Sequence, residues 1–174
     1  VSSDSFVTTG LIANNGSLSI TRRTLTANTI DGSGDVHVVA GLVTASRIRQ
    51  SSLTLLGTSR ATLSAANGPS RLAQLSMEPL TRLNLRDGAV VLDYDGASPF
   101  TDIRALVASG YAGGSWNGTG INSSSAAVLS RRSALGYAEA DAVGLSDGVF
   151  LGEPTDATAV LLRYTLIGDA NLSG

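Results

Sequence analysis

The chain contains no cysteine and no lysine, and each absence excludes a class of chemistry. Without cysteine there is no disulfide, no thiolate metal ligand and no thiol nucleophile. Without lysine there is no Schiff-base catalysis, no P-loop lysine and no lysine-based isopeptide crosslink. The 12 basic residues are therefore all arginines.

Aromatic residues, charge and long apolar runs are also scarce. Aromatics make up 5% of the chain and charged residues 15%, with a net charge of −2. This balance gives no electrostatic reason to expect nucleic acid or an anionic membrane as a partner. No apolar run approaches the roughly 18 residues that span a bilayer. With 43% hydrophobic residues among 174, we expect one folded domain whose core is built from small and β-branched side chains.

Short apolar-alternating runs fill residues 17–94, separated by turn signals rich in Gly, Asn and Asp. Their leucines recur at steps of about ten residues, a spacing typical of a sandwich, a barrel or a β-solenoid. The strands are uneven and lack clean hairpin pairs except around Asp87 and Gly88, which favours a solenoid, because each coil has only to cover its neighbours. The sequence therefore predicts an all-β fold of the β-solenoid (parallel β-helix-like) kind, with a β-sandwich as the alternative. The runs are SLSIT, TLTANTI, DVHVV, LVTASRIR, SLTLLG, ATLSA, RLAQLSM, RLNLR and AVVLDY.

One short helix is predicted near residues 98–110. Ser98 offers an N-cap oxygen, Pro99 suits the first helical position, and Gly110 supplies a left-handed stop. We expect this helix to cap the solenoid. Residues 1–96 are then solenoid strands, and residues 97–174 form a helix-plus-strand cap of the same domain. The apolar residues at helical spacing are Phe100, Ile103, Leu106 and Val107.

The segments around the helix are predicted from turn chemistry and apolar pattern. Asp87 and Gly88 form a turn pair in which Gly accepts a positive φ. After the helix, the Gly-rich loop at 111–120 carries the only tryptophan, Trp116, which we expect to be a packed anchor rather than a ligand platform. Residues 124–131 are expected to form one or two helical turns. Leu135–Ala142 and Ala157–Ile167 read as a C-terminal strand pair.

The last six residues match the opening of an EF-hand-type calcium loop. Asp169, Asn171 and Ser173 place oxygen side chains at loop positions 1, 3 and 5, and Gly174 takes the sharp turn at position 6. The carboxylate of position 12 is missing. We therefore expect no cofactor, and calcium binding only if the loop is completed.

The carboxylates offer little support for catalysis. Asp93 and Asp95 lie two apart on a predicted strand, and with Asp87 they could form a glycosidase-like carboxylate set. A turn already explains Asp95, however, and no basic residue or sugar-stacking ring is evident around the pair. His37, alone between two valines, is expected to lie on a strand face rather than to bind a metal. We expect that the chain is not an enzyme.

Five stretches together prompt a comparison with a known family: LVTASRIRQSSLTLLGTSRATLSA, SRLAQLSM, RLNLRDGAVVLDYDGASPFTDIRALVASGYAGGSWNGTGI, ALGYAEA and DATAVLLRYTLIGDANLSG. They resemble a family of large secreted proteins of planctomycete-type bacteria that carry autotransporter-like β-solenoid repeats. The resemblance covers roughly residues 40–174 and implies an end module placed just before a dockerin-like calcium segment. Here the usual GDANLDG is GDANLSG, with Ser173 in place of a carboxylate.

Two functional hypotheses follow. The first is a secreted, cell-surface structural or adhesive module that acts by self-association or by surface contacts. Residues 1–20 are strand-like and carry no helix or proline to block an edge, so they could stack on another copy, giving a filament or ring, or on an upstream solenoid segment. The second is a carbohydrate-active or carbohydrate-binding β-solenoid. Cell-surface polysaccharide is a further expected partner, and a membrane span is not expected.

Overall fold

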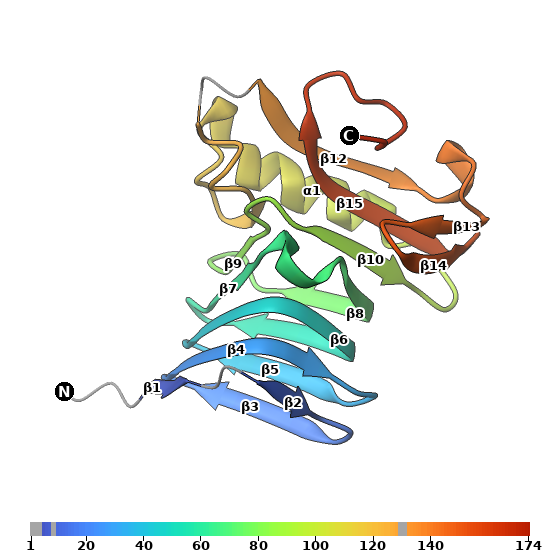
Figure 1. The fold of residues 1–174 in the computed structure, drawn as a ribbon. Coiled ribbons are helices and arrows are strands. Elements are labelled where there is room, and N and C mark those ends of the chain that lie inside the picture. The colour runs from blue at the N-terminus through green and yellow to red at the C-terminus, as the bar shows by residue number, and fades with distance from the viewer. Residues whose placement is uncertain (1–4, 8–9, 129–131) are drawn as a thin grey trace.

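The fold is a stack of parallel β-coils that ends in a helix and an antiparallel strand pair (Figure 1). The computed structural model describes residues 5–7, 10–128 and 132–174. The N-terminal coil lies at one end of the stack, and the C-terminal strands lie at the other. This confirms the predicted solenoid with one short helix and a C-terminal strand pair. The strands of the parallel stack are β1 (Ser5–Val7), β2 (Leu11–Ala13), β3 (Ser17–Thr21), β4 (Thr24–Asp31), β5 (Asp35–Val39), β6 (Leu42–Leu56), β7 (Arg60–Leu63), β8 (Ser70–Met77), β9 (Arg82–Asn84), β10 (Ala89–Asp93) and β11 (Gly120–Asn122).

The coils repeat because equivalent residues stack in register. Thr24 pairs with Leu42, and Leu42 pairs with Arg60, so one coil takes 18 residues, a length that the contact from Asn15 to Ser33 also spans. Later coils are longer: the bond from Arg47 to Pro69 spans 22 residues. The ten-residue step in the sequence is therefore about half a coil.

Side chains that point inward form continuous apolar columns. Alternate residues of a strand face the same side, so strict register places like residues one above another. The longest column is almost free of solvent contact, and burying a leucine-sized side chain contributes roughly 1.5–3 kcal/mol. Its members are Leu25, Val43, Ala61, Leu83 and Ile121.

The turns between strands differ from those predicted. The pair at Asp87 and Gly88 does not join a hairpin, because β9 pairs with β7 and β11 while β10 pairs with β8 and β15. It is a corner between two faces of one coil. The left-handed residue there is Arg86, with φ of 49°, and its N–H donates to Asn84 Oδ1 at 3.0 Å.

Helix α1 (Phe100–Tyr111) covers the last coil. The N–H of Phe100 donates to Ser98 Oγ at 3.1 Å, but the N-cap residue is Pro99, one position later than predicted. Ile103 and Val107 are buried in the same apolar cluster as the solenoid columns, whereas Leu106 is only partly buried. The helix and the coils therefore share one core. The left-handed residue after the helix is Ala112, not Gly110.

The C-terminal strands add an antiparallel layer to the stack. Strand β15 (Ala159–Leu166) pairs with β10 on one side and with β12 (Ser133–Glu139) on the other, antiparallel in both cases. Strands β13 (Asp147–Phe150) and β14 (Glu153–Asp156) form a separate hairpin, which the sequence did not predict. Part of the predicted helical segment 124–131 is a turn, and residues 129–131 lie outside the described residues. Short 3-10 turns occur at η1 (Ala65–Asn67), η2 (Ala112–Gly114) and η4 (Asp141–Val143).

Candidate functional site

The C-terminal loop is docked on the body of the protein. Leu172 is 4% exposed and packs in a second apolar cluster with residues of β10 and β15. Its carbonyl accepts a hydrogen bond of 2.6 Å from Arg163 Nη1. The Leu172 side chain passes so close to Gly136 that a Cβ there would lie 2.4 Å from it. The first half of the predicted calcium loop is thus held in place by apolar packing.

The side-chain oxygens of Asp169 and Asn171 in that loop already accept hydrogen bonds within the chain. Asp169 Oδ1 accepts from the Ser173 N–H at 3.1 Å, and Asp169 Oδ2 accepts from the Gly174 N–H at 3.0 Å and from the Thr165 hydroxyl. Asn171 Oδ1 accepts from the Ser173 N–H at 3.3 Å. The Thr165 hydroxyl bond, followed by the backbone bonds, holds the pKa of Asp169 below its usual value. The loop thereby keeps Asp169 ionised while its oxygens are satisfied by N–H and O–H donors.

Metal-binding groups of three or more His, Asp or Glu side chains are not found among the described residues. His37 lies on β5 between the buried Val36 and Val38, and in the ladder it stands between Ser19 and Thr54. This is the strand-face position expected from the sequence. Nor does any helix in the described ranges have the length and apolar character to cross a membrane.

The three aspartates considered for catalysis are not brought together. Asp93 at the end of β10 forms an ion pair with Arg71 of β8, a neighbour that the sequence did not reveal. Asp95 lies beyond the strand end and is exposed. Asp87 lies at another corner, where its Oδ1 accepts from the Ala65 N–H at 3.4 Å. Asp93 is thus committed to an ion pair across two coils.

The hairpin β13–β14 is attached to the solenoid flank by charge. Glu153 is 3% exposed and forms an ion pair with Arg47, and its second oxygen lies 3.5 Å from Arg49 Nη2. Arg71 Nη1 donates to the Pro154 carbonyl at 2.7 Å. Because these contacts join residues far apart in sequence, no local sequence motif indicates them.

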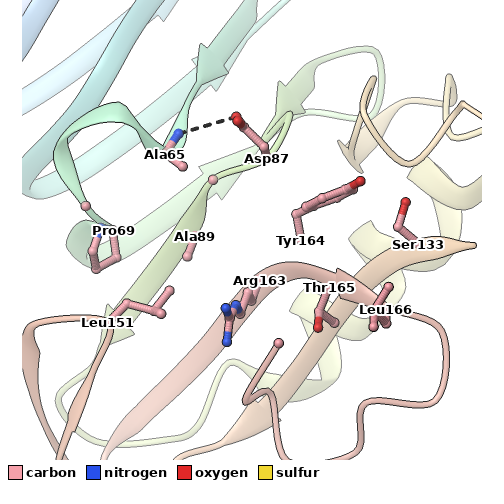
Figure 2. A pocket seen from close by; sticks show the side chains of 13 residues that line it. Ala65, Pro69, Asp87, Ala89, Ser133, Leu151, Arg163, Tyr164, Thr165 and Leu166 are labelled. Atoms are coloured by element: carbon pink, nitrogen blue, oxygen red, sulfur yellow. Dashed lines mark hydrogen bonds between the residues drawn. The ribbon is translucent and has the colours of Figure 1, made fainter. Parts of the chain in front are cut away.

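A cavity of about 520 Å³ lies between a solenoid corner and β15 (Figure 2). Pro69 and Ala65 form the solenoid side, while Arg163 and Thr165 project from β15. Ser133 also lines it, and its buried hydroxyl has no hydrogen-bond partner. The lining is otherwise mainly apolar, and the last residue, Gly174, forms part of the wall.

Trp116 is a packed residue, as predicted. It is 7% exposed and belongs to the solenoid core cluster. Its ring meets that of Tyr111 edge-on, with centroids 5.1 Å apart. The backbone N–H of Trp116 donates to the Tyr111 carbonyl at 3.0 Å, and the φ of Trp116 is 52°.

The N-terminal end of the stack is open, and burial falls toward it. In one column Ile30 and Ile48 have no exposed surface, whereas Ile12, in the first coil, is only partly buried. In a second column, Val36 has no exposed surface, whereas its partner Leu18, in the first coil, is only partly buried. In the described part of the chain, β1, β2 and β3 each pair on one side only.

No protein-family model, no curated protein and no solved structure matches the chain.

Proposed function

We propose that the chain is a structural or adhesive module, without catalysis, that associates through the N-terminal edge of its solenoid. The observation that supports this is the contrast between the two ends. At the far end α1 lies against the last coil, whereas the apolar columns at the N-terminal end stop at the half-buried Ile12 and Leu18. A strand edge with unpaired backbone groups and an uncovered column beside it favours pairing with another strand.

The direction of the free backbone groups in β3 defines the contact. The Arg22 N–H donates to Val39, and the Gly16 carbonyl accepts from Asp35, so residues 16 and 22 face β5. Successive residues of a strand alternate sides. Ser17, Ser19 and Thr21 therefore direct their backbone groups away from β5, toward the open edge.

The partner is a second copy or a further solenoid segment. A copy cannot add its N-terminal coil directly onto β11, because α1 crosses that strand at backbone contact distance. Pairing of two N-terminal edges gives a closed two-fold dimer. A filament instead needs an acceptor at the other end, and the outer edge of β12, which pairs only with β15 among the described strands, is the candidate.

A proline in β3 tests the self-association. Replacing Ser19 by Pro removes one outward N–H without removing a bond to β5, and proline is tolerated in edge strands. We expect light scattering to show mass rising with concentration for the unmodified chain and a monomer for Ser19→Pro. Ser19→Thr, which keeps the N–H, is the matched control and should associate normally. An unmodified chain that stays monomeric at high concentration would exclude self-association.

We also propose that the module acts outside the cell, at its surface. The sequence resemblance to secreted surface proteins supports this location. Labelling intact cells that produce the protein with an antibody to this chain tests the location. Signal only after the cells are opened would contradict it.

A further inference from the structure

Two pairs of arginines lie in register on neighbouring coils. Arg49 of β6 pairs with Arg71 of β8, and Arg60 of β7 pairs with Arg82 of β9. Neighbouring strands are only about 4.8 Å apart, and like charges placed directly opposite destabilise a sheet. Each pair therefore needs a source of negative charge.

The first pair finds that charge within the protein. Arg71 forms its ion pair with Asp93, and Arg49 lies 3.5 Å from the buried Glu153. The second pair does not. Within the described ranges, no carboxylate forms an ion pair with Arg60 or Arg82.

The second pair instead lines a groove of about 350 Å³. Of the described residues that line it, none is Asp or Glu, and those other than the two arginines are amide, hydroxyl or apolar. Arg60 is exposed and Arg82 is partly buried, so both guanidinium groups can reach a ligand there. The groove is also lined by Thr62, Asn84, Trp116, Asn117 and Ser124.

The walls of the groove are fixed by hydrogen bonds to the chain itself. Asn84 Nδ2 donates to Ser124 Oγ at 3.1 Å, and Asn84 Oδ1 accepts the Ser124 N–H at 3.0 Å. Asn122 Nδ2 donates to the Gly118 carbonyl at 2.8 Å. Asn117 Oδ1 accepts from Ser115 at 2.8 Å. The polar groups are thus held in place before any ligand arrives, which lowers the entropy lost on binding.

We propose that this groove binds an acidic saccharide, with Arg60 and Arg82 holding its carboxylate or sulfate. A planar guanidinium matches either oxyanion through paired charge-assisted hydrogen bonds. Asn and Thr side chains both donate and accept, which suits sugar hydroxyls, and Trp116 and Ala61 add apolar lining. This assignment does not depend on association at the N-terminal edge, because the groove lies on later coils.

Titration calorimetry on the full chain at 0.15 M salt tests the proposal. The ligands are an oligogalacturonate, a sulfated oligosaccharide, a neutral dextran oligosaccharide and sodium sulfate. We expect saturable binding of at least one acidic oligosaccharide and none of dextran. Arg60→Gln and Arg82→Gln should each weaken binding about tenfold, as the loss of one charge-assisted contact implies. Arg104→Gln, which removes an exposed arginine of α1, is the charge-matched control and should bind as before.

Three results would overturn the proposal: no binding of either acidic ligand, unchanged binding in the Arg60→Gln, Arg82→Gln double variant, or dextran binding as tightly as the acidic ligands. If sulfate bound as tightly as the sulfated oligosaccharide, the groove would be a site for simple anions and not for a saccharide. Thermal melting at low salt provides a check on folding. Either single variant should melt at the same or a slightly higher temperature, because the repulsion between the two arginines is gone.

Discussion

Gly110 lies where α1 crosses β11. A Cβ on this residue would lie 1.8 Å from the carbonyl oxygen of Ile121, a distance at which two backbones cannot both stay in place. The residue is buried within the helix, so its function is close approach rather than a special φ. Gly118 and Gly120 repeat this arrangement opposite Ser109 and Leu106. The cap thus depends on backbone-to-backbone contact.

Replacing Gly110 by Ala should therefore destabilise the protein. Alanine normally stabilises a helix by about 1 kcal/mol relative to glycine, whereas overpacking costs roughly 1–3 kcal/mol or more. We expect the overpacking to dominate and the free energy of unfolding, measured in urea, to fall by at least about 1 kcal/mol. Thr101→Ala, at an exposed position of the same helix, should change it by less than about 0.5 kcal/mol. A stabilised Gly110→Ala variant would show that α1 does not press on β11.

The sequence predicted the conformations of single residues less well than their burial. Trp116 was correctly predicted to be packed, because a large ring beside glycines gains most by folding back. Gly110 and Gly88 were both expected at positive φ, but the left-handed residues are Ala112 and Arg86. Sequence alone shows that a glycine is permitted a special φ. It does not show when a neighbouring backbone is the reason for the glycine.

At the scale of elements, Glu153 is one of the residues that attach the hairpin β13–β14 to the coils, beside the Arg71 bond to Pro154 and the buried Phe150. The buried carboxylate of Glu153 faces Arg47 and Arg49, whose side chains are 22% and 39% exposed. Burial lowers the pKa of Arg47, with the nearby charge of Arg49 as a second cause, and Asp31 opposes the shift. The Glu153 carboxylate is therefore shared by the two guanidinium groups of Arg47 and Arg49.

Removing that acid should loosen the hairpin. Breaking a buried ion pair from one side costs about 3–5 kcal/mol, and partial exposure of the arginines reduces this to roughly 1–3 kcal/mol for Glu153→Gln. Urea unfolding measures the total, and faster amide exchange in residues 147–156 would locate the change. Asp147→Asn, an exposed acid of the same hairpin, should be nearly neutral. Equal stability of Glu153→Gln and Asp147→Asn would mean that the ion pair does not secure the hairpin.

Strands were predicted correctly where apolar residues alternate over a long stretch. They were missed where the residues that stabilise them are far away in the sequence. The alternation in residues 17–94 located β3 to β10 with small errors at the ends, although two predicted runs join as β6. Strand β11 has only three residues, and its pairing with β9 crosses the whole helical insertion. The hairpin depends on an ion pair that spans 106 residues. Of the candidate sites, the tail loop was visible as a motif, whereas the Arg60 and Arg82 groove forms only when β7 and β9 are aligned.

At the scale of the whole molecule, the fold is a column with α1 and the C-terminal strands at one end and β1 to β3 at the other (Figure 1). Every interior coil is stabilised by a coil above and a coil below, which is how solenoids distribute their stability. The first described coil has a neighbour on one side only, so Ile12 and Leu18 remain half-exposed. A further strand at this edge would complete the burial already present in the next coil.

Hydrogen exchange at β3 tests most directly whether the N-terminal edge pairs with another chain. The N–H groups of Ser17, Ser19 and Thr21 point away from β5, whereas those of Leu18 and Ile20 point toward it. In dilute solution we expect rapid exchange at the first three and slow exchange at the other two. Raising the protein concentration should protect Ser17, Ser19 and Thr21 selectively. Rapid exchange of these three amides at every concentration would contradict pairing at the N-terminal edge.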